Sequence, residues 1–277
     1  MPTDPIETHV AHASTRSHRL FGYDLFSEVA GVASLWDLTA LCVRGPALSA
    51  TDRAVLDDLI GCCTVADPRL PPLKLVRLAA AHGSVLAGCA AGLLALEDAF
   101  IGPWSAGAAA RWLRDVEPAL RDAPDPAAEA LRAVDQALAR DGVLPGFGVP
   151  FRDRDERVAA LDACLRRRGR AGRRYWRALR AVEAAAVARK GIGANIGAGV
   201  AACLLDLGFS PREIPTVSAL LALPCILANA YESASQRAPA MQAVDPSAVE
   251  YVGPPHRTSP RAAAAASPAG STTEESP

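Results

Sequence analysis

The sequence predicts an all-α protein. Apolar residues recur with the spacing of helices, and capping signals precede two of these runs. No segment alternates apolar and polar residues for long enough to predict a sheet. Half of the 277 residues are hydrophobic, so the chain can bury a sizeable core.

The N-terminal residues 1–20 are polar and hold three of the five histidines, His9, His12 and His18. We expect a flexible, solvated arm here, and a metal site is the less favoured interpretation. The first residues lack the basic and apolar regions of a signal peptide, which favours a cytoplasmic protein. The longest apolar stretches, 84–96 and 217–230, are shorter than the ~20 residues that cross a bilayer.

The first well-marked helix is predicted after Ser49, because Ser49 and Asp52 have the spacing of a capping box. The apolar residues that follow recur at helical intervals, at Leu56, Leu59, Ile60 and Cys63. A late helix is predicted from Ser210, with proline at its first position and glutamate three residues after the cap. Proline-rich segments predict breaks at 68–72, 118–126 and 145–150.

An arginine-rich helix is predicted after the last of these breaks. Its arginines could bind an anionic ligand, but a solvated face paired with nearby acids is the favoured interpretation. Seven arginines fall within twelve residues, at Arg166, Arg167, Arg168, Arg170, Arg173, Arg174 and Arg177.

Charge and cysteine content argue against nucleic-acid binding and against a metal site. The chain carries 29 basic and 30 acidic residues, which gives no reason to expect a nucleic-acid partner. The cysteines have no metal-ligand spacing and are expected to be buried, reduced and without metal. They are Cys42, Cys62, Cys63, Cys89, Cys164, Cys203 and Cys225.

Six short motifs resemble those of the citrate synthase and citryl-CoA lyase superfamily, in the same order and with matching gaps. The clearest is the segment Leu144 to Phe151, which resembles the glycine-rich loop "PGFGHP". The others are Gly22-Tyr23-Asp24-Leu25 ("RGYD"), Ala91 to Leu96 (before "HGGA"), Asp155-Glu156-Arg157 ("DPR"), Asn195 with Asp206 to Phe209 ("NVD … LGF"), and Tyr251 to Pro254 ("YxGP").

The resemblance implies a mostly helical homodimer in which a small domain is hinged over a large one. It implies a large domain at 21–140 and 206–257 and a small domain at 141–205. The arm at 1–20 and a disordered tail at 258–277 complete the chain, because the tail cannot bury enough apolar surface to fold.

The family forms or breaks a carbon–carbon bond between an acyl-CoA and a keto acid, with an aspartate base and histidine acids. Side chains that cannot do this chemistry stand at the corresponding positions here. These positions are Pro68, Ile101 (or Phe100), Val149, Gly197 and Ala222. Of the residues that bind the acid's carboxylates, the resemblance retains Arg157, which is the expected substrate-binding residue.

Three residues are candidates to replace the lost catalytic groups: His82, Glu97 and Asp98. A structural role for His82, with its ring bonded to a carbonyl, is the favoured interpretation. Asn229 and Glu232 stand where the family has a reactive histidine and acid, and we expect this pair to cap or pack.

The loop residues Pro145, Gly146, Phe147 and Gly148 match the family loop whose backbone helps to recognise the adenine of coenzyme A. Such recognition needs only glycine and proline geometry, so coenzyme A binding could outlive catalysis. Retention of the loop as a turn between domains explains the match equally well.

Two functions therefore stay open. The favoured one is a binding protein for coenzyme A esters with a degenerate active site, acting alone or as the partner of an active family member. The alternative is a diverged enzyme that makes or breaks a carbon–carbon bond of an acyl-CoA, with an acceptor less acidic than oxaloacetate. No tightly bound cofactor and no metal are expected in either case.

Overall fold

The structure is a computed structural model that describes residues 7–81, 83–96, 102–149, 154–236, 245–255 and 257–261. The chain divides into two units, Met1–Ala240 and Met241–Pro277. The described part of the second unit contains one 3₁₀ helix, η3 (Pro246–Ala248), and exposed apolar side chains such as Tyr251. All other elements below belong to the first unit.

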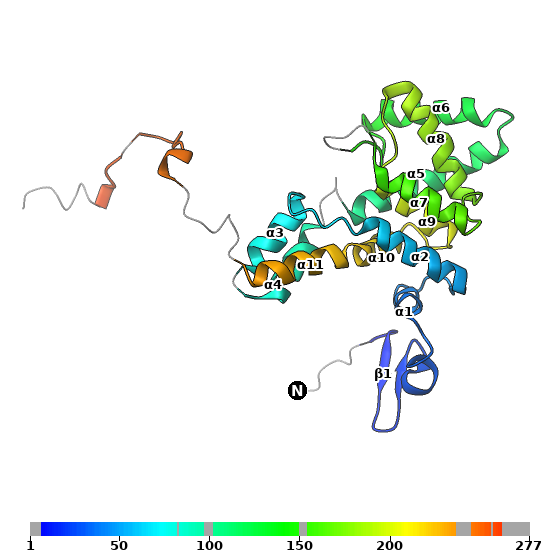
Figure 1. The fold of residues 1–277 in the computed structure, drawn as a ribbon, viewed down its shortest axis with the longest axis horizontal. Helices are drawn as coiled ribbons and strands as arrows, with labels where there is room; N and C mark the ends of the chain where they lie inside the picture. The colour runs from blue at the N-terminus through cyan, green and yellow to red at the C-terminus, as the bar shows by residue number, and fades with distance from the viewer. Residues whose placement is uncertain are drawn as a thin grey trace, which may run out of the picture. The chain divides into compact units, whose positions relative to one another are not determined.

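Helices dominate the first unit, which confirms the predicted all-α class (Figure 1). The described residues form the helices α1 (Leu35–Cys42), α2 (Ala50–Cys63), α3 (Pro71–Ala80), α4 (Val85–Ala95), α5 (Pro103–Asp122), α6 (Pro126–Asp141), α7 (Glu156–Arg167), α8 (Arg174–Lys190), α9 (Ile196–Asp206), α10 (Ile214–Leu221) and α11 (Leu223–Ala234).

A small sheet precedes the helices, where we expected a flexible arm. Strand β1 (Ala11–Ala13) pairs antiparallel with β2 (His18–Leu20), and β2 pairs with β3 (Tyr23–Asp24). A π-helical turn, η1 (Leu25–Val29), follows and is capped by Asp24. Strands of two or three residues are too short to show a period of two, so the sequence could not predict this sheet.

Buried residues form two hydrophobic clusters. The large one joins helices α1, α2 and α5 to α10 and is centred on side chains such as Leu113, Leu161 and Trp176. The second joins α3, α4 and α11 through a set made up of Leu73, Val76, Ala80, Leu96, Cys225, Ile226 and Ala230. Helices α7 to α9, which lie in the predicted small domain, share the large cluster. The domain boundaries drawn from the sequence stay a prediction.

Three predicted helix boundaries can be compared with the structure. The capping box before α2 is confirmed, because Ser49 accepts from the N–H of Asp52 and Asp52 accepts from the N–H of Ser49. The predicted start at Ser210 is wrong by one turn: 211–213 form a turn, and α10 begins at Ile214. The break predicted within 118–126 is confirmed, because α5 ends at Asp122 and α6 begins at Pro126, although α5 continues through Pro118.

The helices α3, α4 and α11 lie side by side (Figure 1). They pack closely because two glycines of α4 face helices α3 and α11. A Cβ atom on Gly88 would lie 2.8 Å from that of Ala80 and 2.9 Å from that of Ala230. A Cβ atom on Gly92 would lie 2.6 Å from a methyl group of Val76. Glycines four residues apart therefore let the three backbones approach.

Two carboxylates link helices that are distant in sequence. Asp155 is the N-cap of α7, and it also accepts the N–H of Ile196 at the start of α9 at 2.7 Å. Asp206, the last residue of α9, accepts the N–H groups of Tyr175 and Trp176 at 2.7 and 2.9 Å, at the start of α8. Both contacts satisfy N–H groups that a helix cannot bond internally. We call Asp155 and Asp206, with the helix N-termini that they bind, the carboxylate relay.

The prediction of one arginine-rich helix is wrong, because α7 ends at Arg167 and α8 begins at Arg174. Ion pairs with nearby acids confirm the favoured interpretation for four of the seven clustered arginines. The pairs are Arg166–Asp162, Arg168–Asp58, Arg170–Asp52 and Arg174–Glu117.

The expectation of buried cysteines holds for two of the seven. Cys203 and Cys225 are buried, whereas Cys42 is exposed and the others are half-buried. No group of histidine, cysteine or acidic residues in the described ranges could hold a metal ion.

One run passes a length and composition test for crossing a membrane. It spans α10 and α11, Ile214–Ala234, and 44% of its most apolar window is buried within the fold. A buried core helix of a soluble protein passes the same test.

Candidate functional site

The glycine-rich loop, Pro145 to Gly148, lies between α6 and α7, and two of its residues have positive φ angles. Gly146 and Gly148 both have a φ of +81°, a region that favours glycine. A Cβ atom on Gly146 would lie 2.7 Å from that of Ala198 and 3.0 Å from that of Ala109, so this glycine is also required by packing. Among the described residues, no atom beyond the chain neighbours of Gly148 lies within 4 Å of the corresponding position on this glycine.

Backbone hydrogen bonds fix the loop against the segment before α9. The N–H of Asn195 donates to the carbonyl of Gly146 at 2.8 Å, and the N–H of Gly148 donates to that of Gly193 at 2.9 Å. The side chain of Asn195 donates to the carbonyl of Gly148 at 3.0 Å and accepts from the N–H of Gly197. The carbonyl of Phe147 has no hydrogen-bond partner within the described ranges.

The ring of Phe147 anchors the loop in the large hydrophobic cluster. It packs edge-on against Trp112 of α5, with ring centroids 5.8 Å apart. The ring therefore contributes to the fold, and only the backbone of Phe147 remains for a ligand.

Arg157 lies in the first turn of α7, where Asp155 already binds it. Its Nε and one Nη atom each donate to a different Asp155 oxygen at 2.7 Å. The Asp155 side chain is 1% exposed and that of Arg157 is 27% exposed. Burial alone would raise the pKa of Asp155, but the Arg157 guanidinium and the N–H of Ile196 outweigh it and lower that pKa. The sequence placed Asp155 in the motif that resembles "DPR" but did not reveal its role as the buried cap of α7 and the partner of Arg157.

The resemblance aligns five positions with catalytic or substrate-binding residues of the family, and the described ones among them do not share one environment. Gly197 is in the first turn of α9, and a Cβ atom there would lie 3.0 Å from Asn195 Oδ1 and 3.1 Å from Ser105 Oγ. Val149 is half-buried at the end of the loop. Pro68 is exposed before α3, and Ala222 joins α10 to α11 against the second cluster.

The catalytic candidates His82, Glu97 and Asp98 lie outside the described residues, as does Ile101. Their roles stay predictions.

Asn229 and Glu232 pack, which confirms their expected structural role. Asn229 donates to the carbonyls of Ala66 and Cys225, both at 3.0 Å. Arg77 of α3 donates to Asn229 at 3.3 Å and also binds Glu232. These contacts hold α11 against α3.

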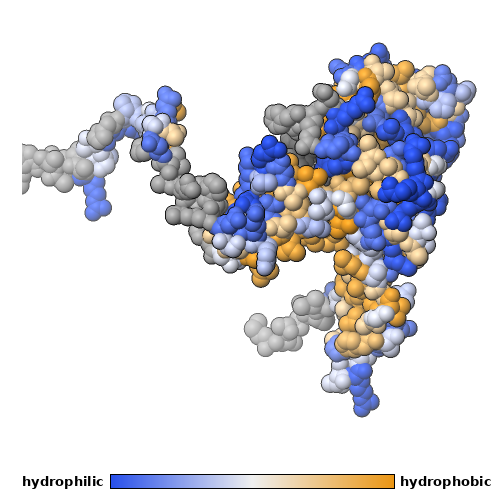
Figure 2. Space-filling model, in the orientation of Figure 1, coloured by the Kyte–Doolittle hydropathy of each residue, from blue (hydrophilic) through white to orange (hydrophobic). Residues whose placement is uncertain are grey.

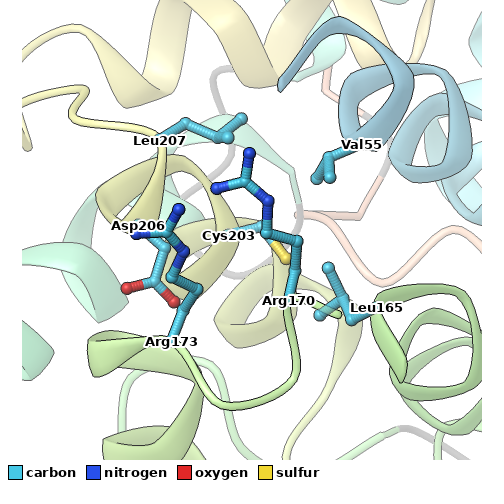
Figure 3. A pocket seen from close by; sticks show the side chains of 7 residues that line it. All are labelled: Val55, Leu165, Arg170, Arg173, Cys203, Asp206 and Leu207. Carbon is cyan, nitrogen blue, oxygen red and sulfur yellow. The ribbon is translucent and has the colours of Figure 1, made fainter. Parts of the chain in front are cut away.

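A shallow hollow lies elsewhere, between α2, α9 and the α7–α8 connection (Figure 3). Two polar residues that line it have structural partners. Arg170 binds Asp52, and Asp206 belongs to the carboxylate relay. Burial raises the pKa of Asp206 although two N–H groups donate to it. The lining residues are Val55, Leu165, Arg170, Arg173, Cys203, Asp206 and Leu207.

The site around the loop can therefore bind an anion or a polar ligand better than it can move a proton. Asp155 is the buried acid there within the described ranges, and its lowered pKa makes it a weak base at neutral pH. Glu183, which is also close by, accepts the N–H of Ala194 at 3.1 Å and pairs with Arg180. Arg157 keeps one guanidinium nitrogen, Nη1, without a hydrogen bond in the described part of the chain, where a ligand carboxylate could bind.

No protein-family model matches the sequence, and no curated protein sequence matches it at a significant level. Solved structures do share its fold. The citryl-CoA lyase of Hydrogenobacter thermophilus has a TM-score of 0.76 at 20% identity, over 92% of this chain and 98% of that one. The ATP citrate lyase of Methanothrix soehngenii, solved with citrate and coenzyme A, has a TM-score of 0.70 at 17% identity, over 92% of this chain and 42% of that one.

The citrate synthase of Thermotoga maritima MSB8 has a TM-score of 0.56 at 18% identity, over 75% of this chain and 55% of that one. Identities of this size establish the fold alone. The chain has the fold of the citrate synthase and citryl-CoA lyase superfamily, as its motifs predict.

Proposed function

We propose that this protein binds a coenzyme A thioester beside the glycine-rich loop and does not carry out citrate chemistry itself. The observation that carries the proposal is the contrast within the site: hydrogen bonds hold Gly146 and Gly148 of the loop in place, whereas the buried acid beside it, Asp155, is paired with Arg157. A ligand that recognises backbone could bind beside Gly148 and at the carbonyl of Phe147, which the described part of the chain leaves uncovered and without a hydrogen-bond donor. Citryl-CoA is bound by a structural neighbour, an ATP citrate lyase of Methanosaeta concilii.

Calorimetry with coenzyme A and acetyl-CoA tests the binding. We expect Gly148→Ala to weaken binding, because its new methyl group would lie where we propose that the ligand binds. Gly142→Ala is the matched control: it also has a positive φ, +71°, and open space at the Cβ position, but it caps α6. Both variants carry the same backbone strain, so an equal loss of affinity, or no heat with the unaltered protein, would contradict the proposal.

Two assays test the absence of catalysis: release of free thiol from acetyl-CoA with oxaloacetate, and formation of oxaloacetate from citryl-CoA, because cleavage of citryl-CoA leaves the thioester intact. We expect neither product. Turnover that disappears when His82, Glu97 or Asp98 is replaced would favour the diverged enzyme instead, with that residue as the base or acid.

We also propose that a second copy of the chain covers an exposed apolar face on α4 and α11. Every residue of α4 is apolar, yet only the half that carries Gly88 and Gly92 is packed. The opposite half exposes Leu86 (81%) and Leu94 (75%), and α11 exposes Leu227 (54%). In Figure 2, hydrophobic atoms lie along the lower edge of the α4 and α11 region, next to hydrophilic ones. A helix that is apolar all round belongs in an interior, which a dimer would provide.

Light scattering after gel filtration tests the dimer. We expect Leu86→Glu to give a monomer, while Val187→Glu on α8, also an exposed apolar position, leaves the dimer intact. If the unaltered protein is monomeric, the surface instead fits the alternative of a heterodimer with an active family member. The proposed location of either assembly is the cytoplasm.

A further inference from the structure

We propose that Cys62 and Cys164 form a reversible disulfide that ties α2 to α7. Neither residue belongs to the proposed coenzyme A site, so the disulfide stands or falls independently of that function. Both side chains are half-buried, which leaves them open to a small oxidant, whereas Cys203 is buried.

The register of the two helices brings the thiols together. Arg168, the C-cap of α7, binds Asp58 of α2 through two guanidinium nitrogens. One turn further along α2 is Cys62, and one turn back along α7 is Cys164. Residues four apart lie on the same face of a helix, so this antiparallel register places the two cysteines opposite each other.

Interaction between the thiols is evident from their electrostatics. Burial raises the pKa of Cys62 to about 11, and an electrostatic contact and a hydrogen bond with Cys164 raise it further. The neighbouring Cys63 is a poorer partner, since burial raises its pKa to about 12 and it lies near Arg157 at the other end of α7.

Arg167 contacts Cys164, the thiol that we expect to react first. One of its guanidinium nitrogens donates to the Cys164 sulfur at 3.1 Å. Burial raises the pKa of Cys62 although Arg167 also lies near it, so Cys62 acts second.

The chemistry balances with hydrogen peroxide as the oxidant. The Cys164 sulfur attacks one peroxide oxygen, the O–O bond breaks, and the thiol proton leaves with the other oxygen as water. The product is a sulfenic acid at Cys164. The Cys62 sulfur then attacks that sulfur, the S–O bond breaks, and a second water leaves. Two thiols are oxidised by two electrons, one peroxide is reduced, and a dithiol reductant reverses the step.

The disulfide would fix α7 against α2. The first turn of α7 holds Arg157, and its N-cap, Asp155, starts the carboxylate relay. Oxidation would therefore restrain the helix that borders the glycine-rich loop.

Peroxide treatment of the full-length protein, followed by thiol blocking, digestion and mass spectrometry, tests the proposal. We expect a cross-linked peptide containing Cys62 and Cys164, and a fall in free thiols from seven to five. The melting temperature should rise by about 5 °C or more, because the bond closes a long loop. Cys164→Ser should abolish the cross-link and the shift, whereas the control Cys89→Ser should change neither.

Two further variants separate the roles of the residues. Cys62→Ser should leave a sulfenic acid at Cys164 that dimedone traps. Arg167→Ala should slow cross-linking several-fold, and Arg167→Lys should restore part of the rate. A disulfide to Cys63 or Cys203 in place of Cys62, or oxidation that stops at Cys164 in the unaltered protein, would overturn the proposal.

Discussion

The glycine-rich loop and the three-helix cluster α3–α4–α11 both depend on glycine, but they are stabilised by different forces. Around the loop, directional hydrogen bonds and a buried ion pair join the 193–195 segment, Asp155 and Arg157. In the three-helix cluster, Gly88 and Gly92 allow close apolar contact, and half of α4 remains exposed.

The comparison indicates which kind of substitution should destabilise each region. Removing one polar partner leaves the other partner unsatisfied, which costs more than the contact itself. Adding one methyl group to a tight apolar contact forces the helices apart. The first region is held by contacts within one chain, whereas the second leaves apolar side chains exposed, which the proposed second copy would cover.

The largest expected effect comes from Asp155→Ala, which should lower the free energy of unfolding by about 3 kcal/mol. The substitution leaves Arg157 half-buried and unpaired and removes the acceptor at the start of α9. Urea denaturation measures the change. Replacing Arg157 by Met in the same variant should recover part of the loss, and simple additivity of the two substitutions would contradict a buried pair.

The pH dependence of the same site gives a second test. The folded pKa of Asp155 is lowered, so its stabilisation is present above the unfolded value of about 3.9 and is lost as the pH falls through the folded pKa. Asp155→Asn should therefore be less stable than the unaltered protein at pH 7, and the difference should shrink below about pH 4. A constant difference from pH 7 to pH 3 would argue against an ionised Asp155.

In the three-helix cluster, Gly92→Ala should destabilise the protein by about 1–2 kcal/mol, although alanine favours helices. Its Cβ atom would lie 2.6 Å from a Val76 methyl group and 2.9 Å from one of Ile226. Gly61→Ala is the matched control, since Gly61 is also helical but has open space at the Cβ position. We expect this control to be stabilised by about 0.5–1 kcal/mol.

The smallest effect should come from Arg189→Ala. Arg189 pairs with Asp135 on the surface, where both side chains are exposed to solvent. Exposed pairs are screened and restrict two long side chains, so we expect no measurable change in melting temperature. A clear drop would indicate that the α6–α8 contact depends on this pair.

The sequence predicted the fold class because apolar spacing and capping boxes are local signals. Ser49 and Asp52 lie within one turn of each other, and so their pairing is readable. Asp155 was not recognised as a buried cap because its second partner, Ile196, is 41 residues away. The break within 118–126 was readable because prolines mark both of its ends, but the sequence did not show that α5 runs through Pro118 before it ends at Asp122.

The candidate site was predicted in part. Motif spacing brought together the loop, Arg157 and Asn195, and the structure places Asn195 against the loop. Motif spacing could not reveal that Asp155 already accepts hydrogen bonds from Arg157. The pairing of two side chains leaves no repeating pattern in the sequence.

The carboxylate relay makes three helices depend on one another in order. If α7 opens, Asp155 withdraws from the first amide of α9, and if α9 opens, Asp206 withdraws from the first turn of α8. Hydrogen–deuterium exchange should therefore show the N-terminal amides of α8 and α9 losing protection together. These helices would behave as a single cooperative folding unit, although they belong to separate stretches of sequence.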